Sequence, residues 1–130
     1  MRALLLTLLL VLPLRAQEAW TRTDTVVESA CVAALLVDWG QTLTIADKQQ
    51  TFVYSDCTIK WSPYQESNPL LHHHPSRGEV NRYFALTLLT HAALVVITPP
   101  RWRHLVQGMT LGIELYCVGR NARAGIKITF

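Results

Sequence analysis

The stretch from Tyr83 to Thr98 contains no Lys, Arg, Asp or Glu, and it constrains the fold more than any other feature of the chain. A helix that is apolar on every side lies in a protein core or in lipid, whereas a surface helix of a soluble protein has a polar face. A chain of 130 residues has little protein in which to bury such a helix. The stretch therefore favours a membrane-spanning helix over a core helix of a small soluble protein.

Two further apolar segments lie on either side of this stretch. The first, from Val26 to Ala46, is long enough to cross a bilayer, which needs about 20 residues. The other, from Leu105 to Gly119, is shorter and carries Gln107 and Glu114, so it predicts either a third span or an amphipathic helix on the membrane surface. The expected fold class is all-α, a small helical membrane protein with about three transmembrane helices after a signal peptide.

The amino terminus has the features of a secretory signal peptide. Met1 and Arg2 precede a Leu-rich run of about ten residues, which suits a signal sequence and is too short to span a bilayer. We expect residues 1–16 to be a signal peptide or, because the cleavage motif is imperfect, an uncleaved anchor. Residues 17–130 then form a single helical membrane domain with a loop at about 47–82.

Basic residues predict the orientation of this domain. If Gln17 lies outside, the loop at about 47–82 and the tail from Arg120 lie inside, and these segments hold most of the Lys and Arg residues. Such a distribution satisfies the positive-inside rule. A compact basic loop from Pro99 to Arg103 falls on the other side. Together with the signal segment, this pattern predicts the bacterial inner membrane, with the periplasm or secretion as the alternative.

Charge and cysteine content exclude several functional classes. The chain has 12 Lys and Arg against 9 Asp and Glu, and these basic residues are scattered singly, so a nucleic-acid-binding surface is not expected. Three cysteines, an odd number, do not make the disulfide framework of a small secreted domain. No nucleotide, haem or dinucleotide motif is present, so we expect no cofactor.

Each apolar segment carries polar residues that a bilayer would not tolerate alone. Asp38 lies in the first segment, and Gln41 and Thr42 share its face on a helix. His91 lies in the second segment and Glu114 in the third. A carboxylate at such a depth is costly unless it is neutral, paired or in a wet cavity. We expect these five residues to meet inside a bundle, either as hydrogen bonds between helices or as a site for binding, proton movement or hydrolysis.

Several short motifs share one pattern with a known class of proteins. They are D-W-x-Q-T at Asp38–Thr42, E-x-N-P-L-L at Glu66–Leu71, H-P-S at His74–Ser76, Tyr83-Phe84 and R-N-x-x-x-G from Arg120. With this pattern the chain, over about Val37 to Phe130, resembles small uncharacterised bacterial or phage-borne membrane proteins of the domain-of-unknown-function class. The resemblance implies no activity. It does suggest one site formed by the intramembrane polar residues and the Glu-Asn-Pro turn, with Glu66, Asn68 and His74 as loop candidates.

The loop between the first two apolar segments contains the triplet His72-His73-His74. Three adjacent residues cannot all face one ion from an ordered backbone, and no C-x-x-C or H-E-x-x-H motif accompanies them, so we expect no metal here. Glu66 or Asp56 would be the additional ligand of such a site. Prolines in this loop exclude a long helix, and its apolar residues predict an ordered loop. Ser76 and Glu79 form an S-x-x-E capping box, which predicts a helix start.

Gly108 and Gly112 form a G-x-x-x-G motif, which lets helix backbones approach closely. The motif predicts either a contact with the small residues of the first helix, Ala30, Ala33 and Ala34, or a homo-oligomer. At the carboxyl end, apolar residues alternate from Ala124 to Phe130 and predict a short strand or an extended tail. The alternative, the last strand of an outer-membrane barrel, is opposed by the length of the chain.

The expected function is that of a small integral membrane protein of the cell envelope with a binding, scaffolding or regulatory role. Its expected partners are the lipid bilayer, a small molecule of unknown identity and a second copy of the chain. A second hypothesis is an intramembrane or membrane-surface hydrolase that uses Asp38, His91 and Glu114 as acid and base. A third is a secreted soluble helical domain that binds a partner. A non-enzymatic role is favoured, since no catalytic motif is present.

Overall fold

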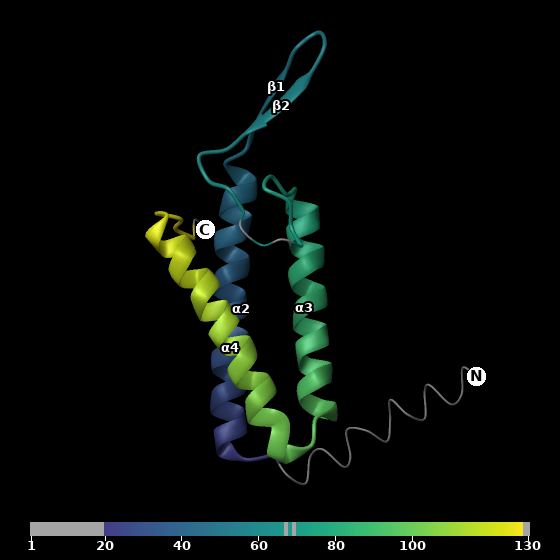
Figure 1. Cartoon of the computed structure of the whole chain (residues 1–130), viewed down its shortest axis with the longest axis vertical. Coiled ribbons are helices and arrows are strands. Elements are labelled where there is room, and N and C mark those ends of the chain that lie inside the picture. The colour runs from purple at the N-terminus through teal and green to yellow at the C-terminus, as the bar shows by residue number, and fades with distance from the viewer. Residues whose placement is uncertain (1–19, 67, 69, 129–130) are drawn as a thin grey trace, which may run out of the picture.

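A computed structural model describes residues 20–66, 68 and 70–128, so the signal segment expected at residues 1–16 lies outside the described part of the chain. Three helices, α2 (Arg22–Asp47), α3 (Arg77–Ile97) and α4 (Pro100–Arg123), run up, down and up in a bundle. A hairpin of β1 (Gln50–Val53) and β2 (Thr58–Trp61) projects beyond one end (Figure 1). The expectation of three helices is confirmed, and the small sheet is an addition to it.

Side-chain caps determine where the first two helices begin. Thr21 caps α2, because its hydroxyl accepts a hydrogen bond from the Asp24 amide and the Asp24 carboxylate accepts one from the Thr21 amide at 2.8 Å. The capping box expected at Ser76 and Glu79 is present at the start of α3, with a distance of 2.8 Å from the Ser76 amide to the Glu79 carboxylate. Pro100 occupies the first turn of α4, where its missing N–H is not needed.

The hairpin is the one element that the sequence analysis did not predict. Its strands are antiparallel, with Gln50 opposite Trp61 and Val53 opposite Thr58, and the Tyr54 amide closes the turn on the Cys57 carbonyl at 2.8 Å. Every residue of both strands is exposed. Threonine, valine, isoleucine and aromatic residues favour strands. Because neither strand has a buried face, the sequence lacks the sustained alternation of apolar and polar residues that predicts a strand.

Near the hairpin, the buried part of the interface between α2 and α3 is apolar. Leu35 of α2 packs with Val80 and Phe84 of α3, and Leu71 from the preceding loop completes this buried cluster. Trp39 stacks on the Phe84 ring at a centroid distance of 5.8 Å. This cluster lies toward the hairpin end of the bundle, because it joins the second half of α2 to the first half of α3.

The interface between α2 and α4 is polar instead. The buried residues of α4 are Arg103, Gln107, Glu114 and Asn121, spaced by four and then seven residues, so they form one stripe along the helix. α4 crosses α2 at an angle (Figure 1), and residues of this stripe contact α2 at two levels, Arg103 at Asp24 and Asn121 at Asp38. The large apolar residues of α4 lie outside the bundle: Trp102, Leu105, Met109, Ile113, Leu115 and Tyr116.

Among the described helices, α2 and α3 are long and apolar enough to cross a membrane, while α4 is too polar to meet the same criterion. Core helices of soluble proteins also meet it, so the property by itself gives only weak support for a membrane location. With 26 and 21 residues, α2 and α3 are about 39 and 32 Å long. Both lengths exceed the hydrocarbon thickness of a bilayer, about 30 Å.

The glycine motif of α4 does not pack on the small residues of α2, which was the first of the two contacts predicted for it. Gly108 and Gly112 are exposed, and a Cβ added at either would meet nothing within 4 Å, so a contact with α2 through this motif is wrong. Gly40 of α2 does make a close approach, since an added Cβ would lie 3.1 Å from Ile128 of the tail. The described tail residues, 124–128, form no strand: the chain turns at Ala124 and Gly125, and the Ile126 amide bonds back to the Asn121 carbonyl at 3.0 Å.

Candidate functional site

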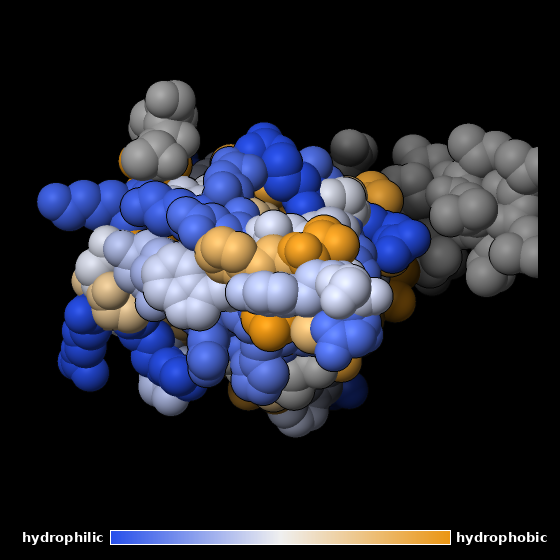
Figure 2. All heavy atoms as spheres, turned by 90° about the horizontal axis from the view of Figure 1, so that it is seen from above, coloured by the Kyte–Doolittle hydropathy of each residue, from blue (hydrophilic) through white to orange (hydrophobic). Residues whose placement is uncertain are grey.

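The interior of the bundle is unusually polar, whereas many large apolar side chains are exposed. Buried polar and charged residues come from all three helices and include Asp24, Asp38, Gln41, Thr42, His91, Arg103, Gln107, Glu114 and Asn121. Exposed large apolar residues on α2 and α3 include Leu36, Leu86, Leu89 and Ile97. Viewed from the hairpin end, the surface is mostly hydrophilic, with apolar side chains showing between the polar ones (Figure 2).

Nearest the start of α2, a buried ion pair joins all three helices. Arg103 of α4 lies 3.5 Å from the Asp24 carboxylate of α2, and its Nε donates a hydrogen bond to the Val95 carbonyl of α3 at 3.3 Å. The guanidinium also lies over the Trp20 ring, 4.7 Å from its centroid. Because the side chain of Arg103 is fully buried, these contacts must replace its hydration.

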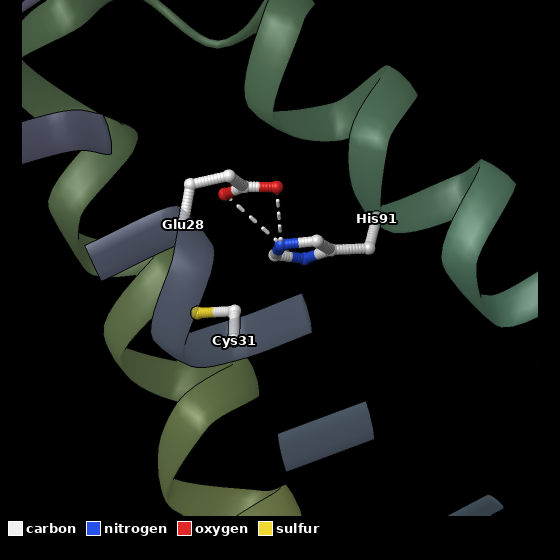
Figure 3. Close-up of side chains that lie close together, drawn as sticks. All are labelled: Glu28, Cys31 and His91. Atoms are coloured by element: carbon white, nitrogen blue, oxygen red, sulfur yellow. Dashed lines mark hydrogen bonds and ion pairs between the residues drawn. The ribbon is translucent and has the colours of Figure 1, made fainter. Parts of the chain in front are cut away.

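One to two turns further into the bundle, a second polar cluster surrounds His91. The His91 Nε2 lies 3.1 Å from a Glu28 carboxylate oxygen (Figure 3), and the His91 Nδ1 lies 3.1 Å from the Thr110 hydroxyl. Gln107 donates a hydrogen bond to Glu28 at 3.1 Å, and the Cys31 thiol donates one to the Gln107 carbonyl at 3.2 Å. The ligand atoms of Glu28, Cys31 and His91 all lie within 4.8 Å of one another, a spacing that a metal ion could bridge.

A third polar contact lies nearer the hairpin end. The Asn121 amide of α4 donates a hydrogen bond to the Asp38 carboxylate of α2 at 2.9 Å. Gln41 and Thr42 are buried one turn further along α2, and the Gln41 Oε1 has no hydrogen-bond partner. This contact joins only α2 and α4, since α3 packs on α2 through apolar residues at this level.

A groove of about 420 Å³ lies between α3 and α4 and opens to the outside of the bundle. Its residues are mixed in character: Tyr83, Leu86, Thr87, Thr90, His91, Leu94, Thr110, Ile113 and Glu114. Its imidazole, His91, comes from α3 and its carboxylate, Glu114, from α4. One carboxylate oxygen of Glu114, Oε2, is buried with no hydrogen-bond partner among the described residues, which is costly in a low-dielectric interior.

The five residues expected to meet inside the bundle are all buried, and the Asp38 and Glu114 carboxylates lie near enough to interact electrostatically, but no single hydrogen-bond network joins the five within the described residues. Asp38 bonds to Asn121, His91 bonds to Glu28 and Thr110, and Glu114 shares the groove with His91. No hydrogen bond joins Asp38 to His91 or Glu114 within the described residues. The arrangement therefore offers no acid and base pair composed of Asp38 and His91.

Several of the polar residues inside the bundle were not predicted as site residues from the sequence. Asp24, Glu28 and Asn121 were not singled out, and Arg103 was assigned to an external loop, which is wrong because α4 begins at Pro100 and buries Arg103. A signal was available in the spacing of the polar residues at 103, 107, 114 and 121, which marks one face of a helix. That face is polar rather than apolar, so a search for apolar stripes does not find it.

The loop candidates make a local turn. Glu66 accepts a hydrogen bond from the Asn68 amide at 2.8 Å, and Asn68 accepts one from the Leu70 amide at 3.0 Å. His73, not His74, contacts Glu66, through a backbone hydrogen bond and a ring nitrogen. His72 contacts Glu79 at 3.3 Å, so the three histidines face different surroundings.

The three cysteines differ in exposure and form no disulfide. Cys31 is buried, Cys117 is half-buried and Cys57 is exposed on the hairpin turn. Comparison of the chain with protein-family models, with curated proteins and with solved structures finds no match.

Proposed function

We propose that the chain is a small integral membrane protein of the cell envelope that binds an amphipathic molecule from the bilayer in the groove between α3 and α4. The observation that carries this proposal is the position of α4, which turns its polar stripe inward and its large apolar residues outward. The groove is lined by one buried carboxylate, one imidazole and several apolar side chains, and this lining suits a ligand with both a polar and an apolar part.

The distribution of polarity supports a bilayer around the bundle. In water, burial of apolar side chains drives helix association, and a helix such as α4 would turn Leu105, Met109 and Ile113 inward. In lipid, apolar contacts with the acyl chains are as favourable as contacts between helices, and polar side chains hydrogen-bond across helices instead. The contacts of Arg103, Gln107 and Asn121 have this second character.

The charges at the two ends of the bundle favour one orientation. The hairpin end carries most of the basic residues, namely Lys48, Lys60, Arg77, Arg82, Arg120, Arg123 and Lys127. At the opposite end Arg103 is paired with Asp24 inside the bundle, so that among the described Lys and Arg residues only Arg22 and Arg101 are exposed there. By the positive-inside rule, we propose that the hairpin end faces the cytoplasm of a bacterial cell.

Fractionation and labelling test the membrane part of the proposal. We expect the protein to stay in the inner membrane after an alkaline wash. A variant with Cys31→Ala and Cys117→Ala keeps only Cys57, at the exposed hairpin turn. A membrane-impermeant maleimide should label this variant in inside-out vesicles and not in intact spheroplasts. Release by the alkaline wash would contradict the membrane location, and labelling in spheroplasts would contradict the orientation.

Glu114 makes the ligand proposal specific. A ligand that donates a hydrogen bond or a positive charge to this carboxylate would remove the cost of its unpaired oxygen, while its chain lies against Leu86, Leu94 and Ile113. A hydrogen bond to a charged group is worth about 1.5–3 kcal/mol, which corresponds to about ten- to a hundred-fold in affinity. The proposed ligand class is therefore a long-chain molecule with an amine or hydroxyl donor at its polar end.

Native mass spectrometry of the protein in detergent, titrated with a long-chain amino alcohol, tests this ligand class. We expect a one-to-one complex that Glu114→Leu weakens about ten- to a hundred-fold. Leu115→Ala is the matched control, since Leu115 is the next residue of α4, is exposed and does not line the groove. Equal binding by the parent and the Glu114 variant, or equal binding of a long-chain sulfate, would contradict the proposal.

A further inference from the structure

We propose that Glu28, Cys31 and His91 form a binding site for a divalent transition metal of the zinc class. The three ligand atoms are a carboxylate oxygen, a thiolate sulfur and an imidazole nitrogen, and Zn²⁺ binds all three types. Oxygen-binding cations such as Mg²⁺ and Ca²⁺ do not use sulfur or nitrogen ligands in this way. The site shares His91 with the groove but not Glu114, so the metal proposal does not depend on the proposed ligand.

The distances already approach those of a metal site. Donor atoms at about 2.0–2.3 Å from a tetrahedral Zn²⁺ lie about 3.3–3.8 Å from one another. Here the Glu28 oxygen and the His91 Nε2 are 3.1 Å apart, and the Cys31 Sγ completes a set in which all separations are within 4.8 Å. The Glu28 carboxylate and the His91 ring point toward each other, while the Cys31 sulfur lies to one side of them (Figure 3), so the Cys31 side chain would have to rotate to bring all three onto one ion.

Two neighbouring side chains hold the ligands in a suitable orientation. The Thr110 hydroxyl contacts His91 Nδ1 and thereby leaves Nε2 facing Glu28, which is the arrangement found where a second hydrogen bond orients a metal-bound histidine. Gln107 hydrogen-bonds the other Glu28 oxygen, Oε2. The Gln107 Oε1 is buried in the same region without a hydrogen-bond partner, so an amide oxygen is also available nearby.

The cluster is buried but not inaccessible. His91 lines the groove between α3 and α4, and Glu28 lines a second groove of about 390 Å³ on the surface of α2. The side chain of Glu28 is 20% exposed. Glu28 lies six residues from the first residue of α2, which is about 9 Å along the helix, so an ion would have only a short path from that end of the bundle.

Binding has a definite proton balance. The Cys31 thiol must lose its proton and with it the hydrogen bond to the Gln107 carbonyl, and His91 must bind through a neutral Nε2. The metal–sulfur bond replaces the S–H bond, and the proton passes to solvent. No electron transfer is involved. Metal binding should therefore release protons and weaken as the pH falls.

Cobalt(II) binding to the full-length protein, stripped of metal by a chelator in detergent, tests the proposal. We expect one Co²⁺ per chain, a thiolate-to-cobalt charge-transfer band and displacement of the cobalt by Zn²⁺. Cys31→Ser should remove the band, while Cys117→Ser and Cys57→Ser should keep it, because neither belongs to the cluster. His91→Gln should weaken binding at least ten-fold, and Thr110→Val about ten- to a hundred-fold.

Two results would overturn the proposal. One is a charge-transfer band that survives in Cys31→Ser, and the other is the absence of stoichiometric metal in the folded parent. X-ray absorption of the zinc-loaded parent gives a check that needs no variant, since it must show one sulfur ligand. A spectrum with only oxygen and nitrogen neighbours would also contradict the site. Failure here would leave the groove proposal intact, because Glu114 is not one of the ligands.

Discussion

The two interfaces of α2, with α3 and with α4, differ in polarity. Toward α3, Leu35 packs with Val80 and Phe84, and Trp39 stacks on the Phe84 ring. Toward α4, the contacts are polar from Asp24, which lies near Arg103 and His104, to Asp38, which bonds to Asn121. Near the hairpin end, α2 thus packs on α3 mainly through apolar side chains and pairs with α4 through polar ones, while further from the hairpin Glu28 and His91 make a polar contact between α2 and α3.

This difference indicates which contacts determine the position of α4 against α2. Apolar packing is non-directional, whereas a hydrogen bond needs its donor and acceptor within a narrow range of distance and angle. Arg103, Gln107 and Asn121 each have a defined partner on α2, so together they determine both the rotation and the register of α4. The apolar interface adds packing area, and the polar interface adds specificity.

The largest expected effect follows removal of one partner of the buried ion pair. Arg103→Met should destabilise the bundle by about 3–5 kcal/mol, because the buried Asp24 carboxylate loses the guanidinium charge and keeps only the Thr21 hydrogen bonds and the half-exposed His104 among its described partners. Unfolding in mixed micelles with increasing dodecyl sulfate measures this change. Arg101→Met is the control and should change stability by less than about 0.5 kcal/mol, since Arg101 is exposed. Equal effects of the two variants would remove the basis for a polar interface.

A smaller effect is expected at the other end of the same interface. A double-mutant cycle of Asp38→Ala and Asn121→Ala should give a coupling of about 1–2 kcal/mol, because a single hydrogen bond joins the two side chains. The matched cycle of Asp38→Ala with Asn81→Ala should give none, since Asn81 bonds to Trp39 instead. The same unfolding assay measures both cycles. Equal couplings would show that the polar contact does not position α4.

The smallest effect compares two glycines. Gly112→Ala should stabilise α4 by about 0.5–1 kcal/mol, because a methyl group there meets nothing and alanine favours a helix. Gly40→Ala should lose most of this gain, because its Cβ would lie 3.1 Å from Ile128. Thermal unfolding in detergent can resolve this difference. A destabilised Gly112→Ala would instead support a close contact at this face, as expected for the homo-oligomer that Gly108 and Gly112 predict.

The sequence predicted the helices because helix position depends on local features. The absence of charge from Tyr83 to Thr98, the two prolines after it and the capping box at Ser76 all act within a few residues. The burial of Asp38, His91 and Glu114 was also predictable, since polar residues in apolar segments turn away from lipid. The hairpin was not predicted, because both of its strands are exposed and their sequences show no sustained alternation of apolar and polar residues.

The tertiary structure alone decided which polar residues meet. Asn121 and Asp38 are 83 positions apart, and His91 and Glu28 are 63 apart, so no local rule pairs them. Their pairing depends on how far each helix rotates and where the helices cross, and a rotation by one residue, about 100°, would exchange every partner. The sequence by itself determined that the chain would form helices whose polar residues are buried between them. The packing of α4 on α2 determined that Asp38 would bond to Asn121, that His91 would face Glu28 and Cys31, and that Glu114 would line an open groove.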